Sequence, residues 1–185
     1  MPTVILRPTG TTSFTGWSVN PAAFFDNNLA TSASQNNVTC NWTGPLGDLD
    51  GSLSGATINS FTISLTGRAG RAGASTVTMI MVHSSDGEFA SEAESFSTGV
   101  TTETTSARTT QQDGSSALTF AYINDCSLKM DPNTQGIQAY EYYVTVDYTA
   151  APSGYGHEVN NVASASIAKV KGVATASIAK VIGVD

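Results

Sequence analysis

The chain has 185 residues, enough for one ordinary domain with some residues left over. Hydrophobic residues make up 40% and charged residues 12%, about half the usual charged share of roughly 25%, so neutral polar side chains dominate the surface. A net charge of −7 with only 8 basic residues excludes a nucleic-acid groove, because such a groove needs clustered Lys and Arg to displace the counterions of phosphates.

The charge is unevenly distributed along the chain. Residues 1–158 carry 5 basic and 14 acidic side chains, a net charge of −9, whereas residues 159–185 carry 3 basic and 1 acidic, a net charge of +2. The basic side chains of the second segment are those of Lys169, Lys171 and Lys180. An acidic body with a basic tail predicts that the tail meets an acidic surface, such as that of another copy of the chain.

The N-terminal residues, the apolar runs and the cysteines narrow further the classes of protein to be expected. The N-terminal residues MPTVILRPTG lack a basic leader and a small-residue cleavage site, so no secretory signal is expected. No apolar run reaches 18 residues, and no membrane partner is expected. Cys40 and Cys126 are too few for a disulfide framework, and two separate thiols are favoured over a single bridge. No cofactor is expected, and no CxxC spacing offers a metal site.

Two-residue periodicity predicts strands along most of the chain. The alternation is clearest in YEYYVTVDYTA, where Tyr142, Val144 and Val146 share one face. STVTMIMVHS is apolar on both faces, which favours a central strand. In chain order, the expected strands are residues 3–7, 12–18, 38–43, 58–67, 75–84, 88–96, 117–123 and 140–150.

Polar turn signals separate these strands, and no convincing amphipathic helix interrupts them. They lie at residues 43–51, 67–73, 84–87, 112–116 and 131–136. The pattern predicts an all-β, antiparallel β-sandwich with a jelly roll as its form. An immunoglobulin-like sandwich is the alternative, but its Cys, Trp, Cys arrangement is missing because Trp42 lies only two residues from Cys40.

The amino-acid composition changes after Ala151, which suggests that the chain has three segments. Residues 1–151 are expected to form the β-sandwich domain, residues 152–161 a linker rich in Pro, Gly and polar side chains, and residues 162–185 an extended C-terminal arm. The arm contains two 11-residue repeats, VASASIAKVKG and VATASIAKVIG, which agree at 9 of 11 positions.

Three interpretations of the repeats stay open. An 11-residue period is compatible with a supercoiled helix, although β-branched residues and a closing Gly make an isolated helix marginal. A disordered low-complexity tail is the second. The favoured one is an arm that docks on a partner, with Ile and Val filling pockets and Gly allowing a bend. The residues expected to contact that partner are Ile167, Lys169, Val170, Gly172, Ile178, Lys180, Val181 and Gly183.

Three stretches resemble structural proteins of tailed bacteriophages and related marine viruses. They are SIAKVKGVATASIAKVIGV (166–184), RPTGTTSFTGW (7–17) and INSFTISLTGRAG (58–70). The resemblance implies a non-enzymatic virion protein, such as a capsid decoration protein or a neck, tail or fibre-attached subunit. It would oligomerise and dock through the arm, with other copies of itself and other virion proteins as partners. The expected location is the virion, after synthesis in the host cytoplasm.

The sequence contains no strong catalytic motif. The chain has two histidines, His83 and His157, and no GxSxG elbow, so we expect no enzyme. His83 is expected to face solvent at the end of a strand. The acidic stretch SSDGEFASEAE lacks EF-hand spacing and is expected to be a solvated face. GRAGRAG (67–73) lacks the Lys-Ser/Thr ending of a phosphate loop and favours a hairpin or an exposed loop.

A second function follows from AAFFDNNLATSAS (22–34), which resembles the calcium-loop phrase of discoidin-like carbohydrate-binding sandwiches. The resemblance implies that Asp26, Asn27 and Asn28 supply hard oxygens and that Trp17 or Trp42 stacks on a sugar ring. Core positions for both tryptophans are the alternative. The departure is that Thr31 leads to SAS, with no Trp after it. The alternative function is therefore a glycan- or receptor-binding module, calcium-assisted, with a host-surface glycan as its partner.

Overall fold

The computed structural model describes residues 1–16, 22, 32–34, 41–70, 73–132, 136–151, 169–170 and 173–174. These residues belong to two compact units, Met1–Thr149 and Ala150–Asp185, of which the first holds almost all of the described secondary structure.

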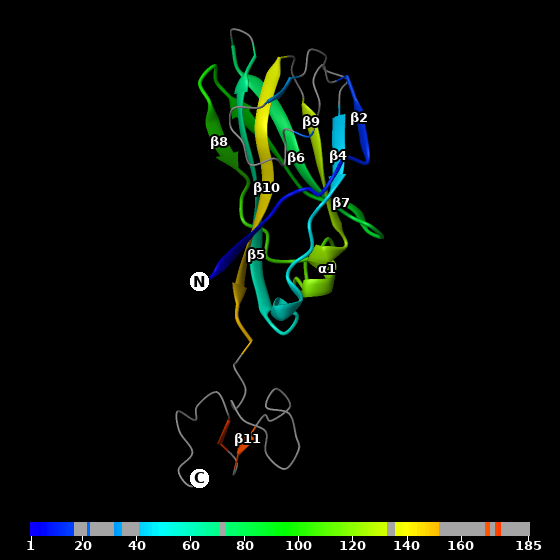
Figure 1. The fold of residues 1–185 in the computed structure, drawn as a ribbon, viewed down its shortest axis with the longest axis vertical. Coiled ribbons are helices and arrows are strands. Elements are labelled where there is room, and N and C mark those ends of the chain that lie inside the picture. The colour runs from blue at the N-terminus through cyan, green and yellow to red at the C-terminus, as the bar shows by residue number, and fades with distance from the viewer. Residues whose placement is uncertain are drawn as a thin grey trace. The chain divides into compact units, whose positions relative to one another are not determined.

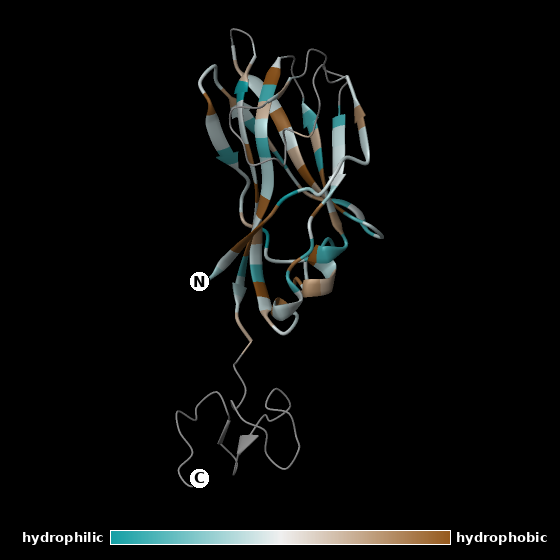
Figure 2. Ribbon diagram, viewed as in Figure 1, coloured by the Kyte–Doolittle hydropathy of each residue, from teal (hydrophilic) through white to brown (hydrophobic). Residues whose placement is uncertain are grey.

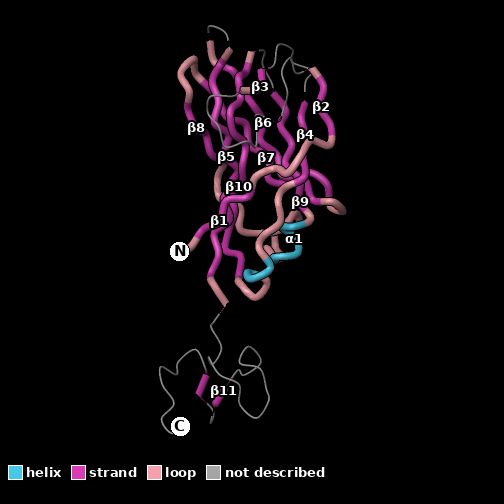
Figure 3. Tube along the Cα trace, viewed as in Figure 1, coloured by secondary structure: helices cyan, strands magenta, loops and turns pink. Residues whose placement is uncertain are grey.

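The first unit contains two antiparallel sheets (Figures 1 and 3). We call them the β10 sheet and the β6 sheet. The β10 sheet runs in the order β1 (Thr3–Leu6), β10 (Ile137–Thr149), β5 (Thr57–Ala69) and β8 (Thr101–Thr104), with β3 (Ala33–Ser34) also paired to β10. The β6 sheet runs in the order β2 (Ser13–Thr15), β4 (Asn41–Pro45), β9 (Cys126–Pro132), β6 (Ser75–His83) and β7 (Gly87–Phe96).

The chain passes repeatedly from one sheet to the other, as in a jelly roll. Strands β1, β3, β5, β8 and β10 belong to one sheet, and β2, β4, β6, β7 and β9 belong to the other. The expected all-β, antiparallel sandwich is confirmed.

The core consists of buried residues from the strands of both sheets, and hydrophobic positions recur along these strands (Figure 2). From β10, Tyr142, Val144 and Val146 are completely buried, as the alternation of this strand predicts. From β4, Trp42 is also completely buried, and its ring meets that of Tyr142 edge to face, with centroids 5.9 Å apart. Trp42 is therefore a core residue and is not available to stack on a sugar.

The prediction of a strand at residues 117–123 is wrong. Residues Phe120–Asn124 form a short helix, α1, and the hydroxyl of Thr119 caps it by accepting a hydrogen bond from the backbone N–H of Tyr122 at 3.1 Å. Tyr122 and its neighbour Ile123 are both buried in this helix. A half-buried strand would send neighbouring side chains to opposite faces, so the helix lets this sequence bury both.

The expectation that His83 faces solvent is also wrong. Its ring stacks on that of Tyr122, with the two centroids 3.9 Å apart and the planes within 7° of parallel. Helix α1 therefore covers the end of β6, and His83 is only 8% exposed.

Four other parts of the structure differ from the sequence-based expectations. The GRAGRAG stretch is not a hairpin, because β5 and β6 lie in different sheets and the segment crosses between them. Strands β8 and β9 were not expected. The turn expected at residues 43–51 leads into a short 3-10 helix, η2 (Gly51–Leu53), whose first backbone N–H groups are capped by Asp50.

The second unit contains two short strands, β11 (Lys169–Val170) and β12 (Val173–Ala174), which pair antiparallel. One strand comes from the first repeat and the other from the second. The backbone of these four residues is extended, so the helical interpretation does not hold for them.

Candidate functional site

A gap in the sheet edge defines the candidate site. On one side of β10, β1 pairs with Val144–Asp147 and β3 pairs with Gln138 and Ala139. The four residues between these pairings, 140–143, have no partner on that side among the described strands. The gap therefore leaves four residues of β10 without a described neighbouring strand on this side.

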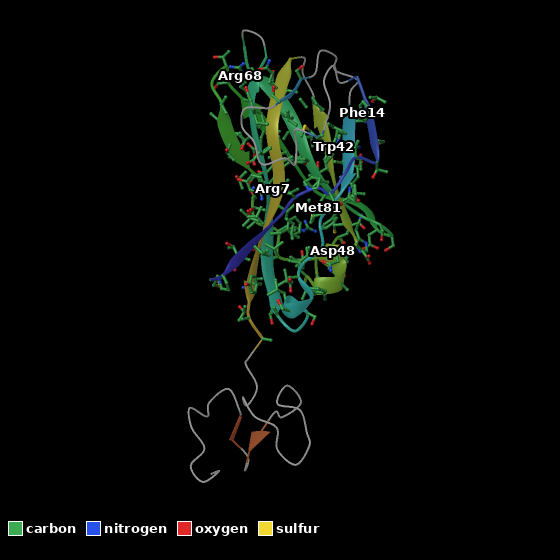
Figure 4. All side chains as sticks on the ribbon, in the orientation of Figure 1. Arg7, Phe14, Trp42, Asp48, Arg68 and Met81 are labelled. Carbon is green, nitrogen blue, oxygen red and sulfur yellow. The ribbon has the colours of Figure 1, made fainter. Side chains whose placement is uncertain are left out.

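Arg7 lies beside this gap, directly after β1 (Figure 4). Its backbone carbonyl accepts a hydrogen bond from the N–H of Gly47 at 2.9 Å, and Pro8 forms a bridge to Leu46. These contacts hold the backbone as the chain leaves the β10 sheet. Because Leu6 pairs with Val144, the next residue, Arg7, lies opposite Tyr143.

The Arg7 side chain contacts two outward-facing residues of β10. Its guanidinium carbon lies 5.7 Å from the centre of the Tyr143 ring, within the range of a cation–π contact. Its Nη2 lies 3.7 Å from Oε1 of Glu141. This distance allows charge attraction but exceeds that of a good hydrogen bond.

Glu141 has unused hydrogen-bonding capacity. Its side chain is 13% exposed, and its Oε1 is buried without a hydrogen-bond partner among the described residues. Buried carboxylate oxygens normally accept hydrogen bonds, so the Glu141 carboxylate has capacity to accept one from water or a ligand.

A row of hydroxyl groups continues across the same face of the sheet. Ser64 and Thr66 of β5 lie opposite Tyr143 and Glu141 in the register of β5 and β10. The Ser64 hydroxyl bonds to that of Thr104 at 2.9 Å, and the Thr66 hydroxyl bonds to that of Thr102 at 2.8 Å. The face beside the site is therefore polar and fixed by pairs of hydroxyl groups.

The site thus combines an acceptor, a donor and an aromatic ring within a small area. The Glu141 carboxylate accepts hydrogen bonds, the Arg7 guanidinium donates them, and Tyr143 offers an apolar surface next to both. Such an arrangement suits a ligand with neighbouring hydroxyl groups, because each hydroxyl both donates and accepts.

His83 offers no equivalent site for catalysis. The hydroxyl of Ser85 and a carboxylate oxygen of Asp86 both lie 3.2 Å from the same ring atom, Nδ1. A nucleophilic triad needs the nucleophile and the acid on opposite nitrogens of the ring, so these three residues do not form one. Within the described ranges, no group of three metal-ligating side chains gathers, and no helix is long and apolar enough to cross a membrane.

Most residues predicted from the sequence to bind partners lie outside the described residues. For the glycan site these are Trp17, Asp26, Asn27 and Asn28; for the arm they are Ile167, Gly172, Ile178, Lys180, Val181 and Gly183. Lys169 and Val170 form β11.

Sequence reasoning did not single out Arg7, Glu141 or Tyr143. The available signal was Tyr143, an aromatic residue on the otherwise polar face of the predicted strand at residues 140–150. The contribution of Arg7 could not be seen, since it depends on the pairing of β1 with β10.

Comparison with known proteins gives distant structural similarities alone. No protein-family model matches the chain. No curated protein matches it either. The C-terminal CBM6 module of LamC, a marine laminarinase from Zobellia galactanivorans, gives a TM-score of 0.45 at 10% identity, over 78% of this chain and 98% of that module.

Two further solved structures are similar at the same level. Truncated AlyQ, with CBM32 and alginate lyase domains, gives a TM-score of 0.41 at 16% identity, over 84% of this chain and 36% of the AlyQ chain. BiXyn10A CBM1, in its apo form, gives 0.34 at 13% identity, over 78% of this chain and 96% of that one. TM-scores below 0.5 assign neither a ligand nor a binding residue to this chain.

Proposed function

We propose that this protein is a non-catalytic binding module that recognises a glycan through Arg7, Glu141 and Tyr143. The observation that carries the proposal is the buried Oε1 of Glu141, which has no hydrogen-bond partner among the described residues and lies beside a guanidinium and an aromatic ring. A sugar hydroxyl would donate to the partly exposed Glu141 carboxylate, a neighbouring hydroxyl would accept from Arg7, and the sugar ring would pack beside Tyr143.

Charge favours a neutral glycan over an anionic one. The residues of the first unit, 1–149, include 13 acidic and 5 basic side chains, a net charge of −8. An anionic polysaccharide would be repelled by this field during approach. A neutral sugar experiences no such repulsion.

The test is a binding screen of the labelled full-length chain against neutral and acidic glycans, with and without calcium. We expect binding to at least one neutral glycan. Glu141→Gln should weaken it by about 10- to 100-fold, because a hydrogen bond to a charged group contributes about 1.5–3 kcal/mol and 1.4 kcal/mol corresponds to a factor of ten. Asp48→Asn removes one charge from an exposed residue elsewhere and should leave binding unchanged.

A second substitution distinguishes the two expected glycan sites. If binding needs calcium and is lost in Asp26→Ala but retained in Glu141→Gln, the segment at residues 22–34 is the binding site and the Glu141 site is wrong. Absence of binding to every glycan, under both calcium conditions, would contradict glycan recognition altogether.

A second candidate function is the assembly role that the bacteriophage resemblance implies. It is favoured by the opposite charges of the two parts of the chain, −9 for residues 1–158 and +2 for residues 159–185, and by the near-identical repeats. In this role the arm links copies of the chain to each other and to other virion proteins. Truncation after Ser153 should leave a folded sandwich that no longer enters particles, and unchanged incorporation would contradict the role.

A further inference from the structure

The edge strand β7 carries acidic residues on its inner side. Glu92 pairs in register with Met79, and Glu94 pairs with Val77. Met79 and Val77 are completely buried in the core. Paired residues of neighbouring strands share a face, so both glutamates point toward the space between the sheets at its open edge.

A third carboxylate faces them from the opposite sheet. Glu103 of β8 pairs with the completely buried Leu65, which places it on the inner side of the β10 sheet at its edge. Burial, followed by the charges of Glu92 and Glu103, raises the pKa of Glu94, so Glu94 feels the negative charge of both neighbours. None of the three has an ion-pair partner among the described residues.

Of the three carboxylates, that of Glu92 lines a cleft of about 260 Å³ between β7 and residues 105–108. Glu92 forms one wall of the cleft. Its carboxylate accepts two hydrogen bonds from Ser106, one from the backbone N–H at 2.6 Å and one from the hydroxyl at 3.2 Å. The guanidinium of Arg108, at the other end, donates to the carbonyls of Thr110 and Gln111. On the inner side of β8, the Thr101 hydroxyl is buried without a hydrogen-bond partner in the described part of the chain.

Strand β7 has no strand partner on its outer side in the described part of the chain, although Gln112 Nε2 donates a hydrogen bond to the Glu88 carbonyl near its start at 3.3 Å. It is the last strand in the order of the β6 sheet and is ten residues long. Every second residue of an edge strand directs its N–H and C=O away from its only partner, which allows another extended chain to add to the sheet.

We propose that this edge, defined by Glu92, Glu94 and Glu103, receives the basic repeat arm of a second copy of the chain. The inference rests on the assembly role proposed above and names the surface that the arm contacts. Charge complementarity selects the occupant, because three carboxylates with no ion-pair partner among the described residues would meet an arm that carries Lys169, Lys171 and Lys180. In the described part of the arm, Lys169–Val170 and Val173–Ala174 are extended and pair with each other, so addition to a sheet edge would use an outer side of this pair.

A second copy suits the length and the repetition of the arm. The 17 residues from 152 to 168 separate the sandwich from β11. Fully extended, they span about 55–60 Å, at 3.3–3.6 Å per residue, which is enough to reach a neighbouring molecule. A homo-oligomer presents the same edge several times, so two equal repeats can engage two equal edges.

The experiment is sedimentation velocity of the full-length chain over a range of concentrations. We expect concentration-dependent self-association at about 50 mM salt that weakens at about 500 mM, since the Debye length falls with ionic strength. The triple variant Glu92→Gln, Glu94→Gln, Glu103→Gln should associate at least about tenfold more weakly. Removal of three exposed carboxylates outside β7 and β8, by Asp48→Asn, Asp50→Asn and Asp125→Asn, should leave association unchanged.

A charge reversal keeps the test independent of folding. Changing Lys169, Lys171 and Lys180 to Glu should abolish self-association, and changing Glu92, Glu94 and Glu103 to Lys should do the same. A mixture of the two variants should associate again. A monomeric wild type at all concentrations, a mixture that stays monomeric, or stronger association when the glutamates are neutralised would each overturn the proposal.

Glycan binding serves as an independent readout in the same samples. The variant with Glu92, Glu94 and Glu103 changed to Gln should keep any affinity for glycan, because these residues lie on β7 and β8, away from the gap in β10. Loss of association with retained glycan binding therefore separates the two proposals.

Discussion

The hydroxyl of Tyr142 connects the two sheets at the centre of the sandwich, and its removal should be costly. Tyr142 lies on β10 and is completely buried. Its hydroxyl donates to the carbonyl of Lys129 on β9 at 2.8 Å and accepts from the N–H of Ile80 on β6 at 3.2 Å. Because Ile80 and Lys129 face each other in the register of β6 and β9, one side chain joins three strands.

Tyr142→Phe keeps the ring and its packing, so the expected loss comes from the two backbone groups alone. Each buried polar group left unpaired costs about 1–3 kcal/mol. The two groups lie opposite each other and can partly pair with one another after a small shift, which favours the lower half of the sum. We expect the free energy of unfolding to fall by about 2–3 kcal/mol and Tm to fall by about 5–10 °C for a protein of this size.

Urea unfolding followed by tryptophan fluorescence measures this loss, since Trp42 packs against Tyr142. The matched control is Tyr148→Phe on the same strand, where the hydroxyl has no hydrogen bond within the described residues and the side chain is half-buried. The free energy of unfolding of this control should lie within about 0.5 kcal/mol of the wild-type value. A Tyr142→Phe protein as stable as this control would refute the role of the hydroxyl.

Three other predictions follow from the packing and the charges. Glu94→Gln should raise Tm at pH 7, since burial and neighbouring carboxylates raise the pKa of Glu94 in the folded state and disfavour its charged form. A raised pKa means that the folded wild type gains stability as the pH falls, so the difference in Tm between Glu94→Gln and the wild type should shrink toward about pH 4.5. A Tm difference that stays constant with pH would contradict this prediction. Gly44→Ala should destabilise by about 1–3 kcal/mol in urea unfolding, because the added methyl would collide with the carbonyl of Gly10 and the ring of Trp42; the control Gly51→Ala has open space and should cost less. The Cys126 thiol should resist alkylation at pH 8 until urea unfolds the chain, because burial raises its pKa to about 12. Mass spectrometry of the peptide that contains Cys126 measures the labelling. Rapid labelling of the folded protein would argue against the burial.

The sandwich was predictable from the sequence because its central strands show a clean two-residue alternation. Tyr142, Val144 and Val146 alternate with polar residues and are completely buried. The helix at Phe120–Asn124 was missed, since Leu118, Phe120 and Tyr122 imitate the same alternation over one turn. The capping by Thr119, visible only in the structure, decides between the two.

The acidic residues of β7 show a second limit of sequence reasoning. Alternating glutamates predict a solvated face, yet Glu92 and Glu94 lie on the inner side of the strand. At the middle of a sheet this placement would bury charge, whereas at an edge the side chains reach the open rim of the sandwich. Strand order decides the outcome, and strand order cannot be read from a local pattern.

The pairing of β1 with β10 affects how the protein folds during synthesis. Val4 lies opposite Val146, so the first strand of the sandwich completes its sheet only against the last. During synthesis, the N-terminal strand must therefore remain unpaired until most of the chain has left the ribosome. Such long-range closure slows folding and leaves strand edges exposed in the partly folded chain.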